Sequence, residues 1–80
     1  MKTVAYTVAA RRTLRKLPKD VQDRLSEKLK KYAADGSGDV KAMAGERGVR
    51  MRVGDYRVIF IETETSIDVI ALGHRRDIYR

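Results

Sequence analysis

Cysteine is absent from this 80-residue chain, and histidine occurs only once, as His74. Without cysteine there are no disulfide bonds to reinforce the modest core that so short a chain can bury. One histidine and no cysteine also leave no Cys/His cluster of the kind that binds zinc. We therefore expect a function that uses no metal and no cofactor.

Long apolar runs are missing as well. Residues 1–6 lack the apolar segment of a signal peptide, and no run approaches the length of a membrane span. The sequence therefore predicts a cytoplasmic protein with no membrane association.

Basic residues outnumber acidic ones, 18 to 11, which gives a formal net charge of +7 and a sequence pI of about 10.1. Such a charge favours polyanions as partners, with nucleic acid first among them. Two alternatives remain open: the charge serves solubility alone, or an acidic protein partner neutralises it.

The N-terminal half predicts one strand and two helices. Apolar and polar residues alternate over residues 3–8, as in a short strand. Helical spacing of apolar residues follows from the candidate N-cap Thr7 to Leu17, and the polar side of this helix is basic. Pro18 suits the first turn of a second helix that ends at Gly36. Its apolar stripe consists of Val21, Leu25, Leu29 and Tyr32.

The C-terminal half changes to a period of two. Residues 36–48 are rich in glycine and small residues and predict a loop. Strands are expected at 49–53, 56–62 and 67–72, with Gly54-Asp55 as a two-residue hairpin turn. The last strand is apolar at nearly every position, which is typical of a strand covered on both faces, and Gly73 is expected to end it.

This order of elements predicts an α+β fold. An N-terminal strand and an αα-hairpin precede a three-stranded antiparallel meander, so both helices should pack on one face of a mostly antiparallel four-stranded sheet. We expect residues 1–80 to form a single domain.

Three arginines should gather on the other face of that sheet. A two-residue turn at Gly54-Asp55 places Arg52 opposite Arg57, with Arg50 on the same side. A like-charge pair across two strands costs some tenths of a kcal/mol unless an anion lies between them. From Arg47 onward every basic residue is arginine, the side chain best suited to phosphate. The alternative is that these arginines are solvated or pair with Asp55, Glu62 or Asp68.

The segment after the last strand also carries side chains useful to phosphate chemistry. Arg75 can stabilise a pentacoordinate phosphate, Tyr79 can stack on a base or move a proton, and His74 is an acid or base near neutral pH. Each has a structural alternative: His74 caps the strand end, Tyr79 closes the edge of the core, and Arg76 and Arg80 are solvated.

These residues together resemble a known family. The run from Arg50 to Phe60, followed by an apolar strand, Gly73-His74-Arg75 and Tyr79, is similar to the RelE branch of the RelE/ParE toxins of prokaryotic toxin–antitoxin systems. The junction Leu17-Pro18 between two helices and the order of elements also agree, so the resemblance covers the whole chain.

The resemblance implies a ribosome-dependent mRNA endoribonuclease that needs no metal and cleaves by attack of a ribose 2′-OH on the adjacent phosphate. It implies that Arg50 and Arg52 hold phosphate and aid proton transfer, that Arg57 and Arg75 stabilise developing charge, and that Tyr79 orients the substrate. RelE has lysines where this chain has the hairpin arginines. Because arginine is a poor acid or base at neutral pH, His74 or Tyr79 is the alternative for proton transfer. Further RNA contacts are expected from Arg47, Arg76 and Arg80.

The implied partners are a cognate antitoxin, the ribosome and mRNA. The positive charge independently suits an antitoxin with an acidic or amphipathic segment. Two other functions remain open at this point. One is that of the ParE branch, which shares the fold but inhibits DNA gyrase, and the other is a non-enzymatic module whose arginines only hold a nucleic-acid backbone.

Overall fold

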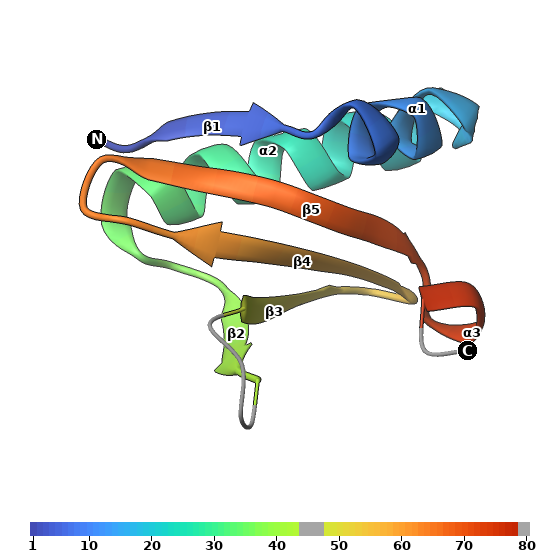
Figure 1. Cartoon of the computed structure of the whole chain (residues 1–80). Helices are drawn as coiled ribbons and strands as arrows, with labels where there is room; N and C mark the ends of the chain where they lie inside the picture. The colour runs from blue at the N-terminus through green and yellow to red at the C-terminus, as the bar shows by residue number, and fades with distance from the viewer. Residues whose placement is uncertain (44–47, 79–80) are drawn as a thin grey trace.

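The computed structural model describes residues 1–43 and 48–78. Five strands form one sheet in the order β1-β5-β4-β3-β2. The strands are β1 (Thr3–Tyr6), β2 (Asp39–Ala42), β3 (Gly48–Val53), β4 (Tyr56–Glu62) and β5 (Ser66–His74). Strand β1 runs parallel to β5, and the other neighbours are antiparallel, so the sheet is mixed. Figure 1 shows β1 beside β5 at one edge of the sheet and β2 at the other.

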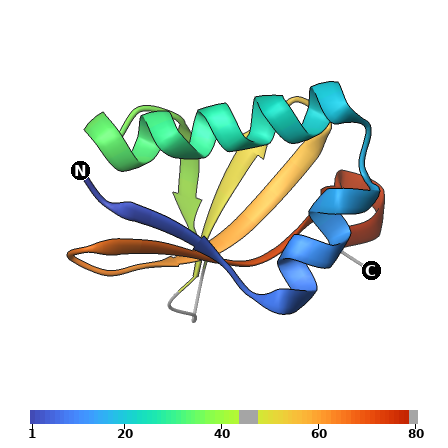
Figure 2. The same cartoon turned by 90° about the horizontal axis from the view of Figure 1, so that it is seen from above.

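Three helices accompany this sheet: α1 (Val8–Lys16), α2 (Lys19–Asp35) and the short α3 (Arg75–Ile78). Thr7 caps α1 as predicted, because its Oγ1 accepts a hydrogen bond from the backbone N–H of Ala10 at 3.1 Å. Pro18 stands at the N-cap of α2, and Gly36 ends this helix in the left-handed region at φ 77°. Helix α2 crosses one face of the sheet, whereas α1 packs against β5 (Figure 2).

The core lies between α2 and one face of the sheet. It contains Leu25 and Leu29 of α2 and the fully buried Val58 and Phe60 of β4. The ring of Tyr32 packs against Phe60 at a centroid distance of 5.3 Å. Alternate residues of β3, β4 and β5 thus face the helix, which is the arrangement that the period of two predicts.

The sheet has one strand more than the sequence predicts. Residues 39–42, expected to be part of a loop, form β2 and pair with β3. Only Val40 of this strand is partly buried against the core. A single core-facing residue is too short a pattern to predict a strand from the sequence. Gly38, directly before the strand, packs closely against the side chain of Met51. A Cβ atom added at Gly38 would lie only 3.3 Å from Cε of Met51.

Strand β5 also differs from its prediction. It continues through Gly73 to His74, and its pairing with β4 shifts between Ile59 and Phe60. Val69 pairs with Phe60 and Ala71 with Ile59, so Ile70 is the additional residue of a β-bulge. Ile70 is 40% exposed, which means that the apolar run does not mark a strand covered on both faces.

The C-terminal segment forms the one-turn helix α3 where the sequence predicts only a tail. Within the described residues, no helix is long and apolar enough to cross a membrane.

Candidate nucleic-acid interface

The helix-free side of the sheet carries the three predicted arginines. Strands β3 and β4 pair in the predicted register, with Val53 opposite Tyr56, Arg52 opposite Arg57 and Arg50 opposite Ile59. Gly54 has φ 59° at the first central position of the two-residue turn, and its lack of a Cβ permits this conformation. The turn therefore fixes which residues of both strands face away from α2. We call Arg50, Arg52 and Arg57 the arginine face.

A shallow hollow of about 320 Å³ lies on this side of the sheet, which we call the basic hollow. Strands β2, β3 and β4 all contribute to its lining, which consists of Asp39, Lys41, Arg50, Arg52 and Arg57. Asp39 and Lys41 were not predicted as site residues, because residues 36–48 predict a loop. The alternation of Asp39, Val40 and Lys41 was the available signal, since only Val40 turns toward the core.

These residues stand in two rows that cross the strands. Asp39 pairs with Arg52, which pairs with Arg57, and this defines the first row. The second row runs from Lys41 through Arg50 to Ile59. Neighbouring strands lie about 4.8 Å apart, so adjacent members of a row are close enough to act on one bound group. Four cations around one hollow repel one another, and a phosphate between them would relieve that repulsion.

Arg57 is also held at the β3–β4 turn. Its Nη1 donates hydrogen bonds to the carbonyl oxygens of Gly54 at 2.7 Å and Tyr56 at 2.9 Å. A cation of α2 is close by, since a Cβ on Gly54 would lie 3.8 Å from Nη1 of Arg24. Nothing in the sequence marks Arg24 as a site residue, because α2 places it next to a turn that is distant in the sequence.

The C-terminal segment reaches the same turn. The backbone N–H of Arg75 donates to the carbonyl oxygen of Asp55 at 2.8 Å, and its Nε lies 3.9 Å from Oδ1 of Asp55. Both side chains are largely exposed, so this ion pair contributes little to stability. Arg57, which lines the basic hollow, and Arg75, which does not, thus both contact the β3–β4 turn.

His74 lies on the opposite side of the sheet. It pairs with Tyr56 across β4 and β5, and the two rings meet edge to face at 5.5 Å. Its Nδ1 accepts a hydrogen bond from the backbone N–H of Arg76 at 3.2 Å, so His74 caps the exit from β5. The structure therefore does not bring His74 to the arginine face. Arg76 is exposed on α3, while Arg47, Tyr79 and Arg80 lie outside the described residues.

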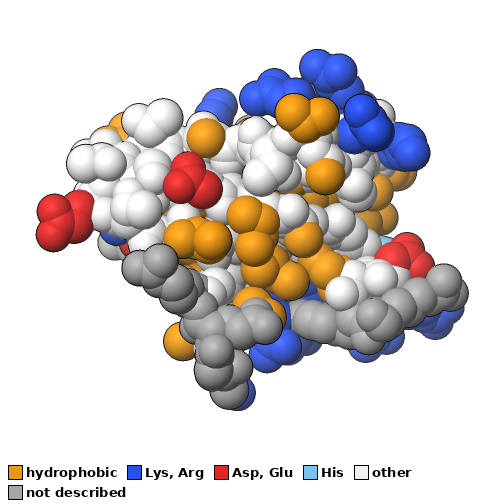
Figure 3. Space-filling model, viewed as in Figure 1, with side chains coloured by type: hydrophobic (Ala, Val, Ile, Leu, Met, Phe, Trp, Pro, Cys, Tyr) orange, Lys and Arg blue, Asp and Glu red, His pale blue; other side chains and the backbone are white. Residues whose placement is uncertain are grey.

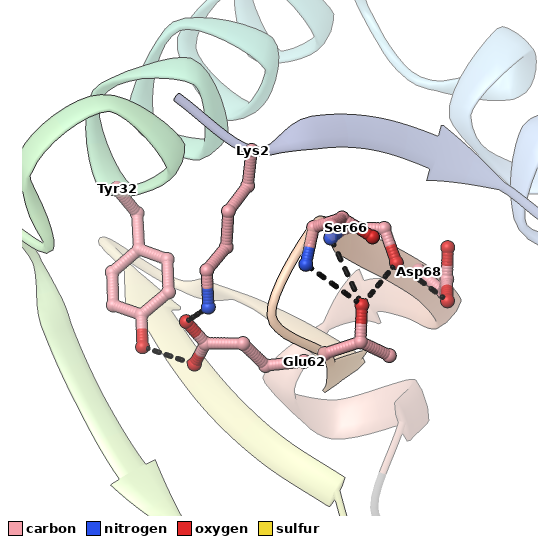
Figure 4. A network of polar contacts seen from close by, with 7 residues as sticks. Lys2, Tyr32, Glu62, Ser66 and Asp68 are labelled. Atoms are coloured by element: carbon pink, nitrogen blue, oxygen red, sulfur yellow. Dashed lines mark hydrogen bonds and ion pairs between the residues drawn. The ribbon is translucent and has the colours of Figure 1, made fainter.

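Two of the carboxylates considered as partners for the arginines are engaged elsewhere. Glu62 accepts hydrogen bonds from Lys2 at 2.6 Å and from the hydroxyl of Tyr32 at 2.7 Å (Figure 4). Asp68 accepts one from Ser66 at 3.2 Å. The hydrogen bond from Lys2 is the main reason that the pKa of Glu62 lies below its ordinary value. Burial, with the bond to Glu62, raises the pKa of Tyr32 to about 12.

The surface beside the basic hollow is apolar. The positions of β4 and β5 that face away from α2 include Ile59, Ile61 and Ala71. Figure 3 shows hydrophobic side chains gathered over the middle of this side, with Lys and Arg side chains over α1 and along the opposite margin. The four basic residues of α1, Arg11, Arg12, Arg15 and Lys16, are all exposed. An apolar centre between basic margins suits a partner that combines negative charge with flat or aliphatic surface.

Within residues 1–43 and 48–78, no three His, Asp or Glu side chains form a group that could hold a metal ion.

The structure is a small α+β domain with a basic hollow on one side of its sheet, and comparison with known proteins identifies its family. The model of the ParE toxin of the type II toxin-antitoxin system parDE matches residues 4–79. The chain therefore belongs to this family of the RelE/ParE superfamily. No curated protein sequence matches the chain significantly.

Solved structures with the same fold include toxin–antitoxin complexes. The RelBE2 complex of Mycobacterium tuberculosis is similar at 25% identity and a TM-score of 0.81, over 92% of this chain and 98% of that one. The archaeal RelE–RelB complex of Pyrococcus horikoshii OT3 is similar at 25% identity and a TM-score of 0.78, over 95% of this chain and 97% of that one. The intact RelBE complex of E. coli has 18% identity and a TM-score of 0.80, over 92% of this chain and 96% of that one. The predicted membership of the RelE/ParE superfamily and the α+β fold are thus confirmed.

Proposed function

We propose that this toxin is an endoribonuclease of the RelE type, which cleaves mRNA on the ribosome. The observation that carries the proposal is the basic hollow, in which Arg50, Arg52 and Arg57 converge from two strands on one side of the sheet. Action on translated mRNA would place the protein in the cytoplasm.

The chemistry is an internal displacement at phosphorus. The ribose 2′ oxygen loses its proton and forms a bond to the adjacent phosphorus, the bond to the 5′ oxygen breaks, and the products are a 2′,3′-cyclic phosphate and a protonated 5′ hydroxyl. The non-bridging oxygens carry more negative charge in the transition state than in the substrate. Fixed guanidinium groups directed at those oxygens therefore lower the barrier more than they strengthen binding.

The arginines divide this work by position. Arg50 and Arg52, on β3, hold the phosphate within the hollow. Arg57 and Arg75 approach from the β3–β4 turn and stabilise the developing charge, which requires Arg75 to exchange its weak contact with Asp55 for the substrate. Arg47, Arg76 and Arg80 contribute further contacts to the RNA backbone.

Proton transfer needs a group other than arginine, which stays protonated at neutral pH. His74 faces away from the hollow and caps the end of β5, so the structure does not favour it for this role. We assign the stacking of the substrate and one proton transfer to Tyr79.

We further propose a cognate antitoxin as the protein partner. The similar structures from M. tuberculosis, P. horikoshii and E. coli are complexes of RelE with RelB or of the corresponding pair. In this chain the basic margins and the apolar centre of the helix-free side suit an amphipathic, acidic segment.

Inhibition of DNA gyrase is the second candidate function, because the matching family model is that of the ParE toxin. In that case the arginines would contact a protein or DNA surface, and no RNA would be cut.

Induced expression in a bacterial host separates the two functions. Wild type is compared with Arg75→Ala and Tyr79→Phe, and with Lys28→Ala as a control for an exposed cation of α2. Growth is followed and the 5′ ends of mRNA are mapped. Growth arrest with new ends inside translated regions, abolished by Arg75→Ala and retained by Lys28→Ala, is the result expected of the endoribonuclease. Arrest with intact mRNA and inhibited DNA supercoiling would instead identify gyrase as the target.

A further inference from the structure

Asp39 is a carboxylate in a hollow that otherwise consists of cations. Within the described part of the chain the Asp39 carboxylate makes no hydrogen bond and no ion pair, although Arg52 stands opposite it and Lys41 lies two residues further along β2. A carboxylate repels phosphate, so Asp39 weakens the attraction for phosphate that the neighbouring cations provide. Its oxygens remain available to accept hydrogen bonds from a bound molecule.

The pairing of the strands gives Asp39 a defined position. Residues 39–42 pair with β3 throughout, Val40 is anchored on the core, and Gly38 packs close to Met51 before the strand begins. Asp39 is therefore carried by a paired strand and lies on the same side of the sheet as Arg52 and Arg57.

The first row of the hollow has a length that suits one nucleotide. Asp39 and Arg57 are separated by two strand spacings, or about 10 Å, with Arg52 between them. A nucleotide whose phosphate lies on Arg52 and Arg57 can extend its base toward β2. The edge of that base would then meet the oxygens of Asp39.

We propose that Asp39 determines base specificity by accepting hydrogen bonds from the base of the nucleotide bound in the basic hollow. This inference rests on the proposed endoribonuclease function and names a preference within it. Guanine offers N1–H and N2–H₂ side by side and can donate to both carboxylate oxygens. Cytosine and adenine each offer one exocyclic amino group. Uracil has no amino group, and its one base-edge donor, N3–H, lies between two carbonyl oxygens that the carboxylate repels. The order of preference at this position is therefore guanine first and uracil last.

Cleavage of matched messages tests this order. Ribosomes are programmed with four mRNAs that differ only in the base at the position cut, and the cleavage rate by wild-type toxin is measured for each. Because a good pair of hydrogen bonds to a base edge discriminates by about ten- to hundred-fold, we expect guanine to be cleaved at least about ten times faster than uracil.

The variant Asp39→Asn should abolish most of that difference. Its amide donates as well as accepts, so it can bind uracil, and it no longer repels carbonyl oxygens. The matched control is Asp68→Asn, because Asp68 lies opposite Ile61 on the same side of the sheet but outside the hollow. The control should keep the wild-type order.

Two outcomes with active wild-type protein would overturn the inference. One is an unchanged base preference in Asp39→Asn. The other is an equal loss of cleavage on all four messages by a variant with unaltered melting temperature, which would give Asp39 a role in the chemistry instead of in base selection.

A binding measurement separates this inference from the proposed function. The purified toxin is titrated with 3′-GMP, 3′-UMP and inorganic phosphate, followed by NMR. Wild type should bind 3′-GMP more tightly than 3′-UMP, and Asp39→Asn should remove that difference while binding phosphate at least as tightly. If no message is cleaved but this pattern appears, the nuclease proposal fails and base reading by Asp39 stands. Equal binding of the two nucleotides by wild type would overturn base reading alone.

Discussion

The two sides of strands β3 and β4 differ: one side forms part of the hydrophobic core, and the other lines the basic hollow. Toward α2, Met51, Val53 and Val58 are at most 5% exposed and form the core. Away from it, the intervening Arg50, Arg52 and Arg57 line the basic hollow. One side gains free energy by removing apolar surface from water, and the other holds like charges together at a cost. Alternation along the same two strands therefore places the core on one side and the proposed binding site on the other, and substitutions on the two sides should have separable effects.

The largest effect on stability is expected from Phe60→Ala on the core side. Phe60 is fully buried, and loss of its ring should lower the free energy of unfolding by about 3–5 kcal/mol, which is most of the stability of a small domain. The neighbouring Ile61→Ala, on the half-exposed side, should cost about 1 kcal/mol or less. Urea denaturation followed by circular dichroism measures both, and equal costs would contradict the contrast between the two sides.

The opposite pattern is expected for Arg52→Ala. Removing one of the cations directed at the phosphate should slow cleavage by a factor on the order of 10²–10³. The free energy of unfolding should stay the same or rise by some tenths of a kcal/mol, because the like-charge pair with Arg57 is gone. Cleavage kinetics and a melting curve on the same preparation are needed. A marked loss of stability would show that Arg52 stabilises the fold. That result would contradict the conclusion that only the core side of these strands contributes to stability.

A smaller effect is expected from Glu62→Gln, at the end of β4 away from the hollow. Gln keeps one acceptor oxygen but loses the charge and one of the two hydrogen bonds, which should cost about 1–2 kcal/mol at pH 7, since the Glu62 side chain is 27% exposed. The folded-state pKa of Glu62 is lowered, so its contribution is present above the ordinary value of 4.5 and is lost as the pH falls through the folded-state pKa. The difference in melting temperature between wild type and variant should therefore shrink in acid. A difference that does not change with pH would contradict the role of the charge.

The sequence predicts the arginine face because local features determine it. Gly54-Asp55 permits a two-residue turn, and alternation on both sides of that turn then decides which residues share a face. The position of His74 depends instead on the bulge at Ile70. Without the additional residue, His74 would face the arginines. With it, His74 shares the side of Leu72 and faces the helix. An apolar run such as residues 67–72 gives no local sign of a bulge.

Strand β2 and the pairing of β1 at the other edge show a second limit of prediction from sequence, which concerns long-range strand pairing. β1 pairs with β5, more than 60 residues away, and no local period reveals which strand it joins or in which direction. β2 consists of four residues with one partly buried side chain between glycine-rich segments, so its pairing with β3 decides its conformation more than its own propensity does. The sequence consequently located three of the cations and missed the carboxylate and the lysine beside them.

The smallest effect is expected from Asp55→Asn, at the turn that joins the two strands. Its ion pair with Arg75 is long, at 3.9 Å, and both groups are largely exposed, so stability should change by no more than about 0.5 kcal/mol. Cleavage should be unchanged or slightly faster, because Arg75 no longer has to leave a carboxylate to reach the substrate. Arg75→Ala, by contrast, should leave the melting temperature equally unaffected and greatly reduce cleavage. If Asp55→Asn slowed cleavage as much as Arg75→Ala does, Asp55 would hold Arg75 in its working position, and the contact seen here would be part of the active arrangement.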